Sequence, residues 1–308
     1  MVCFCNEMLL QRLGKWLVLM VLAVPFASTA GEGAFGWIYT LDLQPKGTLE
    51  FEQRLQRNDR QASGKYDVLL ARTELEYGLT DNLQIAGYVN SYAASIEQNY
   101  TNPQICGASP GCTSGFPVPT SHDRSAPFHQ QGVDGYSFEA IYRLTNPVIE
   151  PLGIGFYAEP TFGKLKNELE ARLILQSNFL DDRLIVASNI VFANEQLKFL
   201  GQGKVPESML DVLFGFSYRF APKWFGGMEA RWHNDFARYN LKNQTQRQIF
   251  FGPNLHFAEK DWWVSAAWRY QPKGGKCYGD GTGECSEGRV WDSHSRNEMI
   301  FKVGMPIH

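Results

Sequence analysis

Segments of about ten residues in which apolar and polar side chains strictly alternate recur along this 308-residue chain. From Leu69 to Tyr77, every second side chain is apolar or neutral, and the positions between them hold Arg72, Glu74 and Glu76. A helix would distribute these charges around its circumference, whereas a strand sorts them onto one face. The pattern therefore predicts strands with one apolar face and one charged face.

The alternation recurs often enough to predict twelve strands, and the connections between them differ in length. Short connections such as 79–82 and 221–223 follow the even-numbered strands, whereas the others are mostly longer and reach 93–135 and 272–294. An even strand number with short turns at one end is typical of an up-and-down antiparallel barrel that spans a bacterial outer membrane. We expect the short turns in the periplasm and the long loops outside the cell. A secreted β-sandwich is the alternative fold.

The apolar rows of such a barrel are expected to face lipid, because twelve strands enclose a space too wide for apolar side chains to fill. Aromatic side chains also gather near the short turns, which is typical of a girdle at a membrane surface. The residues of this predicted girdle are Tyr77, Tyr142, Phe220, Trp224, Phe257, Trp262 and Trp263.

The N-terminus has the pattern of an export signal. Arg12 and Lys15 precede the apolar run 16–26, and the small residues 27–30 follow it. This order predicts a cleaved signal peptide over 1–30 and an outer-membrane barrel domain over 31–308. Residues 31–46 are too few for a plug domain, so an energy-coupled transporter is not expected. The net charge of −3 gives no basic field for nucleic acid.

The predicted mature chain has four cysteines, in two close pairs. Each pair lies in a turn-rich stretch within one of the two longest predicted loops. An exported chain meets an oxidising compartment, so two local disulfides are the simplest pairing among the three that four cysteines allow. A metal site is the alternative, but neither spacing suits one. The predicted disulfides are Cys106–Cys112 and Cys277–Cys285.

The charged rows are predicted to line the barrel lumen. They hold eleven acids and eight bases, so 11 − 8 leaves three surplus negative charges. We expect a passive channel for small polar solutes or ions with weak cation preference. A salt-bridge network that closes the lumen, giving a structural or adhesive barrel, and merely solvated charges are the alternatives. The acids are Glu50, Glu52, Glu74, Glu76, Glu139, Glu159, Glu168, Glu170, Asp211, Glu229 and Glu298, and the bases are Arg54, Arg72, Arg143, Arg172, Arg219, Arg231, Arg269 and Lys302.

Two further patterns carry weaker chemical hypotheses. The stretch 292–295 offers Asp, Ser and His, the side chains of a hydrolytic triad, at the start of the last strand. Neighbouring residues on a strand point to opposite faces, so a lipid hydrolase is the less favoured function and no catalytic residue is assigned. His122 and His129 could bind a metal with Asp123, but histidines in a loop are usually solvated. No metal or other cofactor is therefore expected.

Residues 43–47 (LQPKG) and the strand–turn–strand 74–84 resemble a family of uncharacterised, porin-like outer-membrane barrels of proteobacteria. Some of these are grouped with porins linked to the breakdown of aromatic compounds. The resemblance implies a barrel surrounded by outer-membrane lipid and lipopolysaccharide and inserted by the barrel-insertion machinery. Such barrels usually end on an aromatic residue, whereas this chain ends at His308 and its last aromatic residue is Phe301.

Overall fold

The structure is a computed structural model of the chain. The predicted signal peptide, Cys106, Cys112 and residues 292–293 lie outside the part that it describes. The described residues are 32–99, 116, 118, 122–123, 126–199, 203–278, 285–291 and 294–307.

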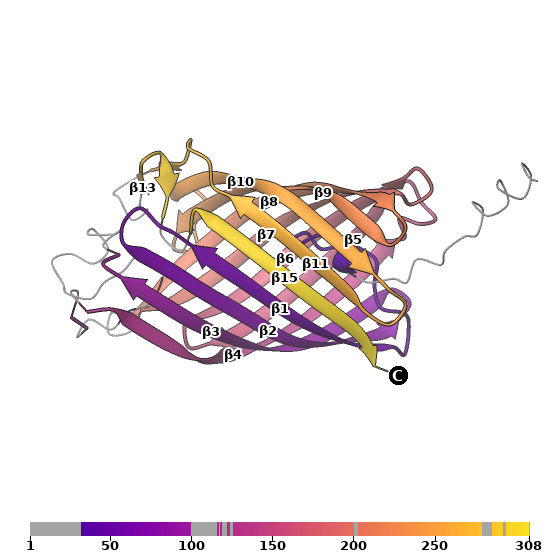
Figure 1. Cartoon of the computed structure of the whole chain (residues 1–308), viewed down its shortest axis with the longest axis horizontal. Coiled ribbons are helices and arrows are strands. Elements are labelled where there is room, and N and C mark those ends of the chain that lie inside the picture. The colour runs from indigo at the N-terminus through magenta and orange to yellow at the C-terminus, as the bar shows by residue number, and fades with distance from the viewer. Residues whose placement is uncertain are drawn as a thin grey trace, which may run out of the picture.

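The described residues form a closed barrel of twelve antiparallel strands, which confirms the predicted fold (Figure 1). Each strand pairs with its neighbours in sequence, and the last strand pairs with both β1 and β11 to close the ring. Three two-residue strands, β12 (Lys276–Cys277), β13 (Cys285–Ser286) and β14 (Arg289–Val290), lie in the last long loop. The barrel strands are β1 (Leu49–Asp59), β2 (Lys65–Thr80), β3 (Leu83–Glu97), β4 (Phe128–Thr145), β5 (Gly153–Gly163), β6 (Lys166–Phe179), β7 (Leu184–Phe199), β8 (Gly203–Ala221), β9 (Trp224–Ala237), β10 (Gln244–Ala258), β11 (Trp263–Tyr270) and β15 (Asn297–Ile307).

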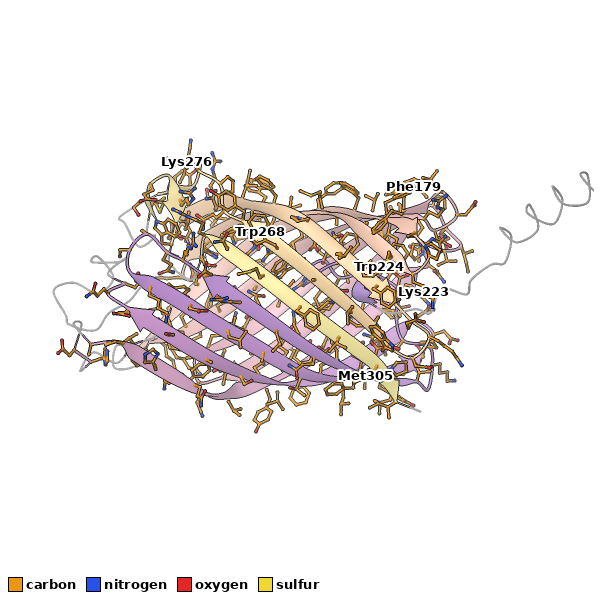
Figure 2. The ribbon with its side chains drawn as sticks, viewed as in Figure 1. Phe179, Lys223, Trp224, Trp268, Lys276 and Met305 are labelled. Carbon is orange, nitrogen blue, oxygen red and sulfur yellow. A yellow bond between two sulfur atoms is a disulfide. The ribbon has the colours of Figure 1, made fainter. Side chains whose placement is uncertain are left out.

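The outer face of the barrel is apolar, and many of its large side chains project away from the strands (Figure 2). Leu75 is 50% exposed and Phe138 is 59% exposed, whereas their neighbours Glu74 and Glu139 are each 4% exposed. Leaving so much apolar surface in water would be costly, so this face needs an apolar surrounding. In the described residues, no helix is long and apolar enough to cross a membrane.

Most of the predicted aromatic girdle lies on this outer face. Trp224 is exposed beside the half-buried Phe257, with their ring centroids 4.7 Å apart. The prediction was wrong for Trp263, which is buried and donates a hydrogen bond from Nε1 to Glu50 Oε1 at 2.9 Å. Trp262 is exposed, and the adjacent residue at the start of β11 points to the opposite face.

The two ends of the barrel differ. At one end, which we call the short-turn end, adjacent strands are joined by connections such as 81–82 and 222–223. The C-terminal strand also finishes at this end (Figure 1). At the other, the long-loop end, the connections include 98–127 and 271–296, although β5 and β6 are joined tightly.

We call residues 32–47 the N-terminal segment, and its residues 33–44 lie inside the barrel. The segment begins with a single 3-10 turn, Glu32–Ala34, and then continues without regular structure to β1. Phe35, Ile38 and Leu41 are each at most 2% exposed. The stretch is too short for a separate plug domain, but an extended chain advances about 3.3 Å per residue and can therefore reach across a lumen.

Candidate functional site

The barrel wall binds the main chain of the N-terminal segment through buried polar side chains. The Glu229 carboxylate on β9 accepts hydrogen bonds from the Gly36 and Trp37 N–H groups at 2.6 and 3.0 Å. Asn189 on β7 accepts from the Tyr39 N–H at 2.8 Å and donates to its carbonyl at 2.9 Å. These side chains therefore pair backbone groups that would otherwise be buried without partners.

The same recognition continues toward the short-turn end. Gln176 on β6 accepts a hydrogen bond from the Leu41 N–H at 2.6 Å. Gln84 at the start of β3 accepts from the Gln44 N–H at 2.7 Å. The segment thus runs from β9 to β3 without joining the sheet. Side chains of the barrel wall, and not a neighbouring strand, form hydrogen bonds with its backbone.

Arginines of the lumen bind the carbonyls of the segment. Arg54 donates to the Gly36 carbonyl at 3.3 Å, and Arg143 donates to the Leu41 carbonyl at 3.0 Å. Hydrogen bonds from a charged donor are among the stronger ones in proteins. The predicted lumen charges therefore hold a piece of the chain itself.

Arg172 contacts both the segment and the wall. Its guanidinium lies 4.4 Å from the Tyr39 ring centroid and 4.9 Å from that of Tyr157. It also pairs with Glu170 at 2.6 Å and donates to the Trp37 carbonyl at 3.3 Å. Such stacking over a ring in a site away from water adds to the ion pair.

Two glycines of the wall make room for the segment. A Cβ atom at Gly155 would lie 2.4 Å from Leu41 Cδ2, and one at Gly215 would lie 2.7 Å from Ile38 Cδ1. Both distances are far below van der Waals contact, so the wall has no side chain where these two residues insert. The fit indicates a segment that packs against the barrel as tightly as a protein core.

The structure places most of the predicted lumen charges inside the barrel, many of them in pairs. Arg72 lies 3.3 Å from Glu159, Lys302 lies 3.7 Å from Glu52, and Arg269 pairs with Glu298. Arg219 lies at the short-turn end, 3.5 Å from the Asp181 carbonyl, and Arg143 also lies near this end beside Asp81 and Asn82. The acids that are at least 90% buried are Glu50, Glu52, Glu74, Glu76, Glu139, Glu159, Glu170, Asp211, Glu229 and Glu298; Glu168 is half-buried.

Burial changes the acidity of groups on the N-terminal segment. Loss of solvent raises the pKa of the Asp42 carboxyl above its usual value, although hydrogen bonds with Gln176 and Thr40 act in the opposite direction. Loss of solvent and the nearby Glu139 raise the pKa of the Tyr39 hydroxyl well above its usual value. Both shifts are the expected result of placing the segment away from bulk water.

A cavity of about 390 Å³, lined by both polar and apolar side chains, lies between the N-terminal segment and the long loops. Trp37 belongs to its lining, together with side chains of both charges such as Arg231 and Glu168. Phe116 and Val118, from the long connection between β3 and β4, are buried against the strands at this end. The lumen therefore has a vestibule on the loop side and a filled section below it.

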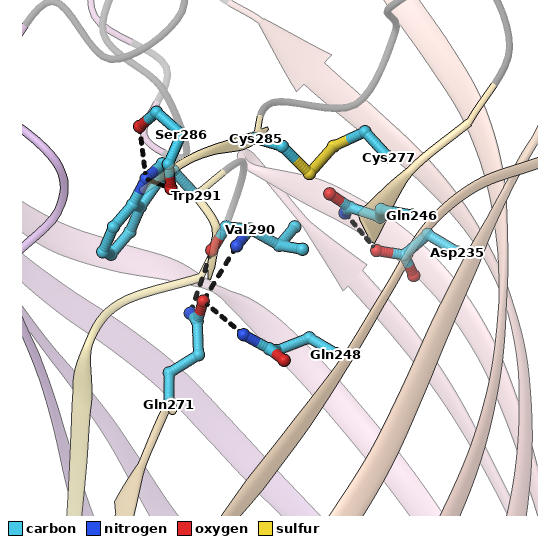
Figure 3. The surroundings of a disulfide bond; sticks show 9 residues. All are labelled: Asp235, Gln246, Gln248, Gln271, Cys277, Cys285, Ser286, Val290 and Trp291. Carbon is cyan, nitrogen blue, oxygen red and sulfur yellow. Dashed lines mark hydrogen bonds between the residues drawn. A yellow bond between two sulfur atoms is a disulfide. The ribbon is translucent and has the colours of Figure 1, made fainter. Parts of the chain in front are cut away.

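The last long loop folds over the same end of the barrel. Cys277 and Cys285 form the predicted disulfide, with their Cα atoms 5.8 Å apart (Figure 3). Gln271 Nε2 donates to the Val290 carbonyl at 2.9 Å, and Trp291 is fully buried. This loop therefore brings buried side chains into the barrel mouth rather than leaving them in solvent.

Next to the cavity, the side chains of His233, Asp235 and His294 come together. His233 Nε2 lies 2.6 Å from Asp235 Oδ2, and His294 Nε2 lies 3.4 Å from the same oxygen. Asp211 Oδ1 lies 2.8 Å from His233 Nδ1. Burial lowers the pKa of the His294 imidazole to about 4, so this residue is neutral near pH 7.

The two weaker chemical hypotheses from the sequence find little support in this arrangement. Ser295 Oγ donates to the Asn297 carbonyl at 2.8 Å, and His294 turns to Asp235 instead. His129 is exposed on β4, while His122 Nε2 lies 3.0 Å from the Ala126 carbonyl. Among the described residues, the His/Asp group with metal-binding spacing is the one around His233.

The sequence reasoning missed the N-terminal segment and the group around His233. A usable signal for the segment was the apolar content of 35–43, which holds Phe, Trp, Ile, Tyr and two Leu and is too apolar for a solvated chain end. For the second, Arg231, His233 and Asp235 share one face of a strand. The approach of His294 depends on loop packing that no periodicity reveals.

Comparison with solved structures finds a similar barrel fold. The COG4313 outer membrane channel from Pseudomonas putida F1 is 10% identical, with a TM-score of 0.53 over 92% of this chain and 100% of that one. The NanC porin is 9% identical over 84% of this chain and 100% of its own, with a TM-score of 0.49. At 10% identity, the first likeness shows a shared fold.

A search of curated protein sequences gives no match. The family model that matches covers residues 27–307, which include every barrel strand and the whole N-terminal segment. The chain therefore belongs to DUF6662, a family of unknown function.

Proposed function

We propose that this protein is an outer-membrane channel whose lumen is closed by its own N-terminal segment and opens when that segment leaves its binding site. The observation that carries the proposal is the set of wall side chains that bind the segment's backbone, led by Glu229 and Asn189. On the loop side of the segment, the cavity of about 390 Å³, with charged side chains in its lining, would supply the entrance. A barrel whose lumen is closed by a segment that can leave its binding site is a gated channel.

The barrel's surface chemistry supports a location in the outer membrane. Its apolar outer rows suit lipid, and closure of the sheet pairs the backbone groups of every strand, as the bilayer core requires. We assign residues 1–30 to an export signal and 31–308 to a barrel in the outer membrane of a Gram-negative bacterium. The long loops would face outside, in contact with lipopolysaccharide, and the barrel-insertion machinery would assemble the chain.

The transported species would be small polar solutes or ions, with weak cation preference. The lumen assignment gives a surplus of three acids, but Glu229, Glu139 and Glu76 accept hydrogen bonds within the protein. Carboxylates engaged in this way repel anions less than free ones, so the preference should be modest and should fade at high salt.

Single-channel recording in planar bilayers tests the proposal. The mature full-length protein should give rare, brief conductance steps, whereas a variant that lacks residues 32–46 should give long openings of larger size. Heat-modifiable migration in detergent gels checks that both proteins form the barrel. An equally quiet deletion variant would refute a closing role for the segment.

A reversible covalent lock provides a second test without a deletion. Leu41 Cδ2 lies 2.4 Å from the place of a Cβ atom on Gly155, so cysteines at both positions can approach the Cβ separation of a disulfide, about 3.8 Å. The oxidised double variant Leu41→Cys/Gly155→Cys should be silent, and reduction should restore openings. The two single variants and the reduced wild type, which controls for Cys277–Cys285, should not change in this way.

A permanently closed structural or adhesive barrel is the second candidate. The tight fit of Leu41 and Ile38 against wall glycines favours it. Under this alternative the full-length protein never conducts, with or without the lock, and only the deletion variant gives steps. The recordings therefore separate a gate from a fixed plug.

A further inference from the structure

A buried group of metal-ligand side chains lines the cavity at the long-loop end. His233 and Asp235 lie two residues apart on β9 and point inward, and the last loop brings His294 against them. The ring centroids of the two histidines are 4.2 Å apart. One nitrogen from each histidine and one carboxylate oxygen all lie within 4.8 Å of one another.

We propose that His233, Asp235 and His294 bind a zinc-class divalent metal ion. Two imidazoles and a carboxylate are typical ligands for such an ion. In a tetrahedral site with bonds of about 2.05 Å, ligand atoms lie about 3.3 Å apart. His294 Nε2 and Asp235 Oδ2 are 3.4 Å apart already. His233 Nε2 is 2.6 Å from the same oxygen and needs to move by less than about 1 Å when the ion replaces their shared proton.

A second layer of contacts holds each ligand in place. Asp211 Oδ1 and Arg231 Nη2 each lie 2.8 Å from His233 Nδ1, so contacts at Nδ1 orient the ring with Nε2 toward Asp235. Gln246 Nε2 donates to the Asp235 carboxylate (Figure 3). Supporting hydrogen bonds of this kind orient metal ligands and raise their affinity.

The loop ligand is also fixed through its backbone. Gln61, which follows β1, donates from Nε2 to the His294 carbonyl at 2.9 Å and to the Trp291 carbonyl at 2.6 Å. The loop that carries His294 precedes β15, and these hydrogen bonds attach it to the residue that follows β1, the strand that pairs with β15. The backbone of the third ligand is therefore fixed by contacts from outside its own loop.

The local charge and the open side of the group suit a cation. Asp211, Asp235 and Glu298 face Arg231 and Arg269, so the carboxylates and guanidiniums around the two histidines sum to −3 + 2 = −1. All three ligands line the 390 Å³ cavity. A water molecule from the cavity can therefore complete the coordination, which makes this an accessible site rather than a closed structural one.

Metal titration of the purified, full-length barrel tests the proposal. The protein in non-ionic detergent is treated with chelator, desalted and titrated calorimetrically with Zn²⁺. We expect one ion per chain. Co²⁺ as a probe should give the visible absorption of a tetrahedral site. His294→Ala and Asp235→Asn should each weaken Zn²⁺ binding at least 10-fold, and Asp211→Asn should weaken it about 10-fold through His233.

The control variant is His256→Gln, which changes a buried histidine of β10 that bonds Ser265 and lies apart from the group. It should bind Zn²⁺ as the wild type does. Heat-modifiable migration shows which variants are folded, and Asp235→Asn, nearly equal in shape, serves if His294→Ala does not fold. No binding by the wild type overturns the proposal, as does binding that survives all three cluster variants. Because the readout is metal binding, the result is independent of whether the barrel conducts.

Discussion

Replacing Glu229 by glutamine should release the N-terminal segment without altering the shape of the wall. The carboxylate accepts two backbone N–H groups, from Gly36 and Trp37, at 2.6 and 3.0 Å. An amide has a single acceptor oxygen, and its NH₂ group would face the second N–H donor. One charge-assisted hydrogen bond is therefore lost in the closed state.

The size of the effect follows from this loss. A hydrogen bond to a charged group contributes about 1.5–3 kcal/mol, so Glu229→Gln should destabilise the closed state by about 2 kcal/mol. Since about 1.4 kcal/mol is a tenfold change in an equilibrium, the ratio of open to closed channels should rise about 30-fold. The open state lacks this contact and should be little affected.

Single-channel recording measures this ratio directly from the time spent open. The matched control is Glu168→Gln, which removes an equal charge from the cavity wall at a residue that pairs with Lys166 and not with the segment. An open fraction that stays within twofold of wild type in Glu229→Gln would refute the reasoning. So would an equal rise in Glu168→Gln, because the effect would then come from lumen charge alone.

Three further changes test other parts of the structure. Asn189→Ala leaves the Tyr39 N–H and carbonyl without their partner, and the open fraction in the same recordings should rise at least tenfold, since each unsatisfied buried group costs about 1–3 kcal/mol. Phe214→Arg places a charge on the apolar outer face. For a residue near the bilayer midplane, this change should lower the free energy of unfolding in lipid vesicles by about 2–4 kcal/mol. An unchanged free energy of unfolding would contradict a lipid-facing position. Replacing Cys277 and Cys285 by serine should speed hydrogen exchange only in the last loop, at a local cost of about 2 kcal/mol, and leave the barrel's heat-modifiable migration intact.

The strands and their faces were predictable because side chains alternate between the two faces along every strand of a barrel wall. Leu75 faces out and Glu74 faces in, as side chains on a strand must alternate. The path of the N-terminal segment was not predictable, since it depends on contacts with residues as far away in sequence as Glu229. Apolar content alone could not distinguish a filling inside the lumen from an additional strand.

The candidate site likewise has a part that the sequence predicts and a part that it does not. The disulfide between Cys277 and Cys285 followed from close spacing in an exported chain. The contacts of His294 could not be predicted from the sequence, because they depend on how the last loop folds back over the barrel mouth. Loop packing is set by many weak tertiary contacts that leave no period in the sequence.

The position of the N-terminal segment constrains the order in which the molecule can assemble. The segment is the first part of the described chain, yet Glu229 and Ala267, which it contacts, lie on β9 and β11. Contacts of such long sequence separation form late and slowly. The segment must therefore wait until most of the wall exists and be enclosed as β15 pairs with β1, or thread into the finished ring from the short-turn end. In either order, the N-terminal segment reaches its binding site only after the strands that bind it have formed.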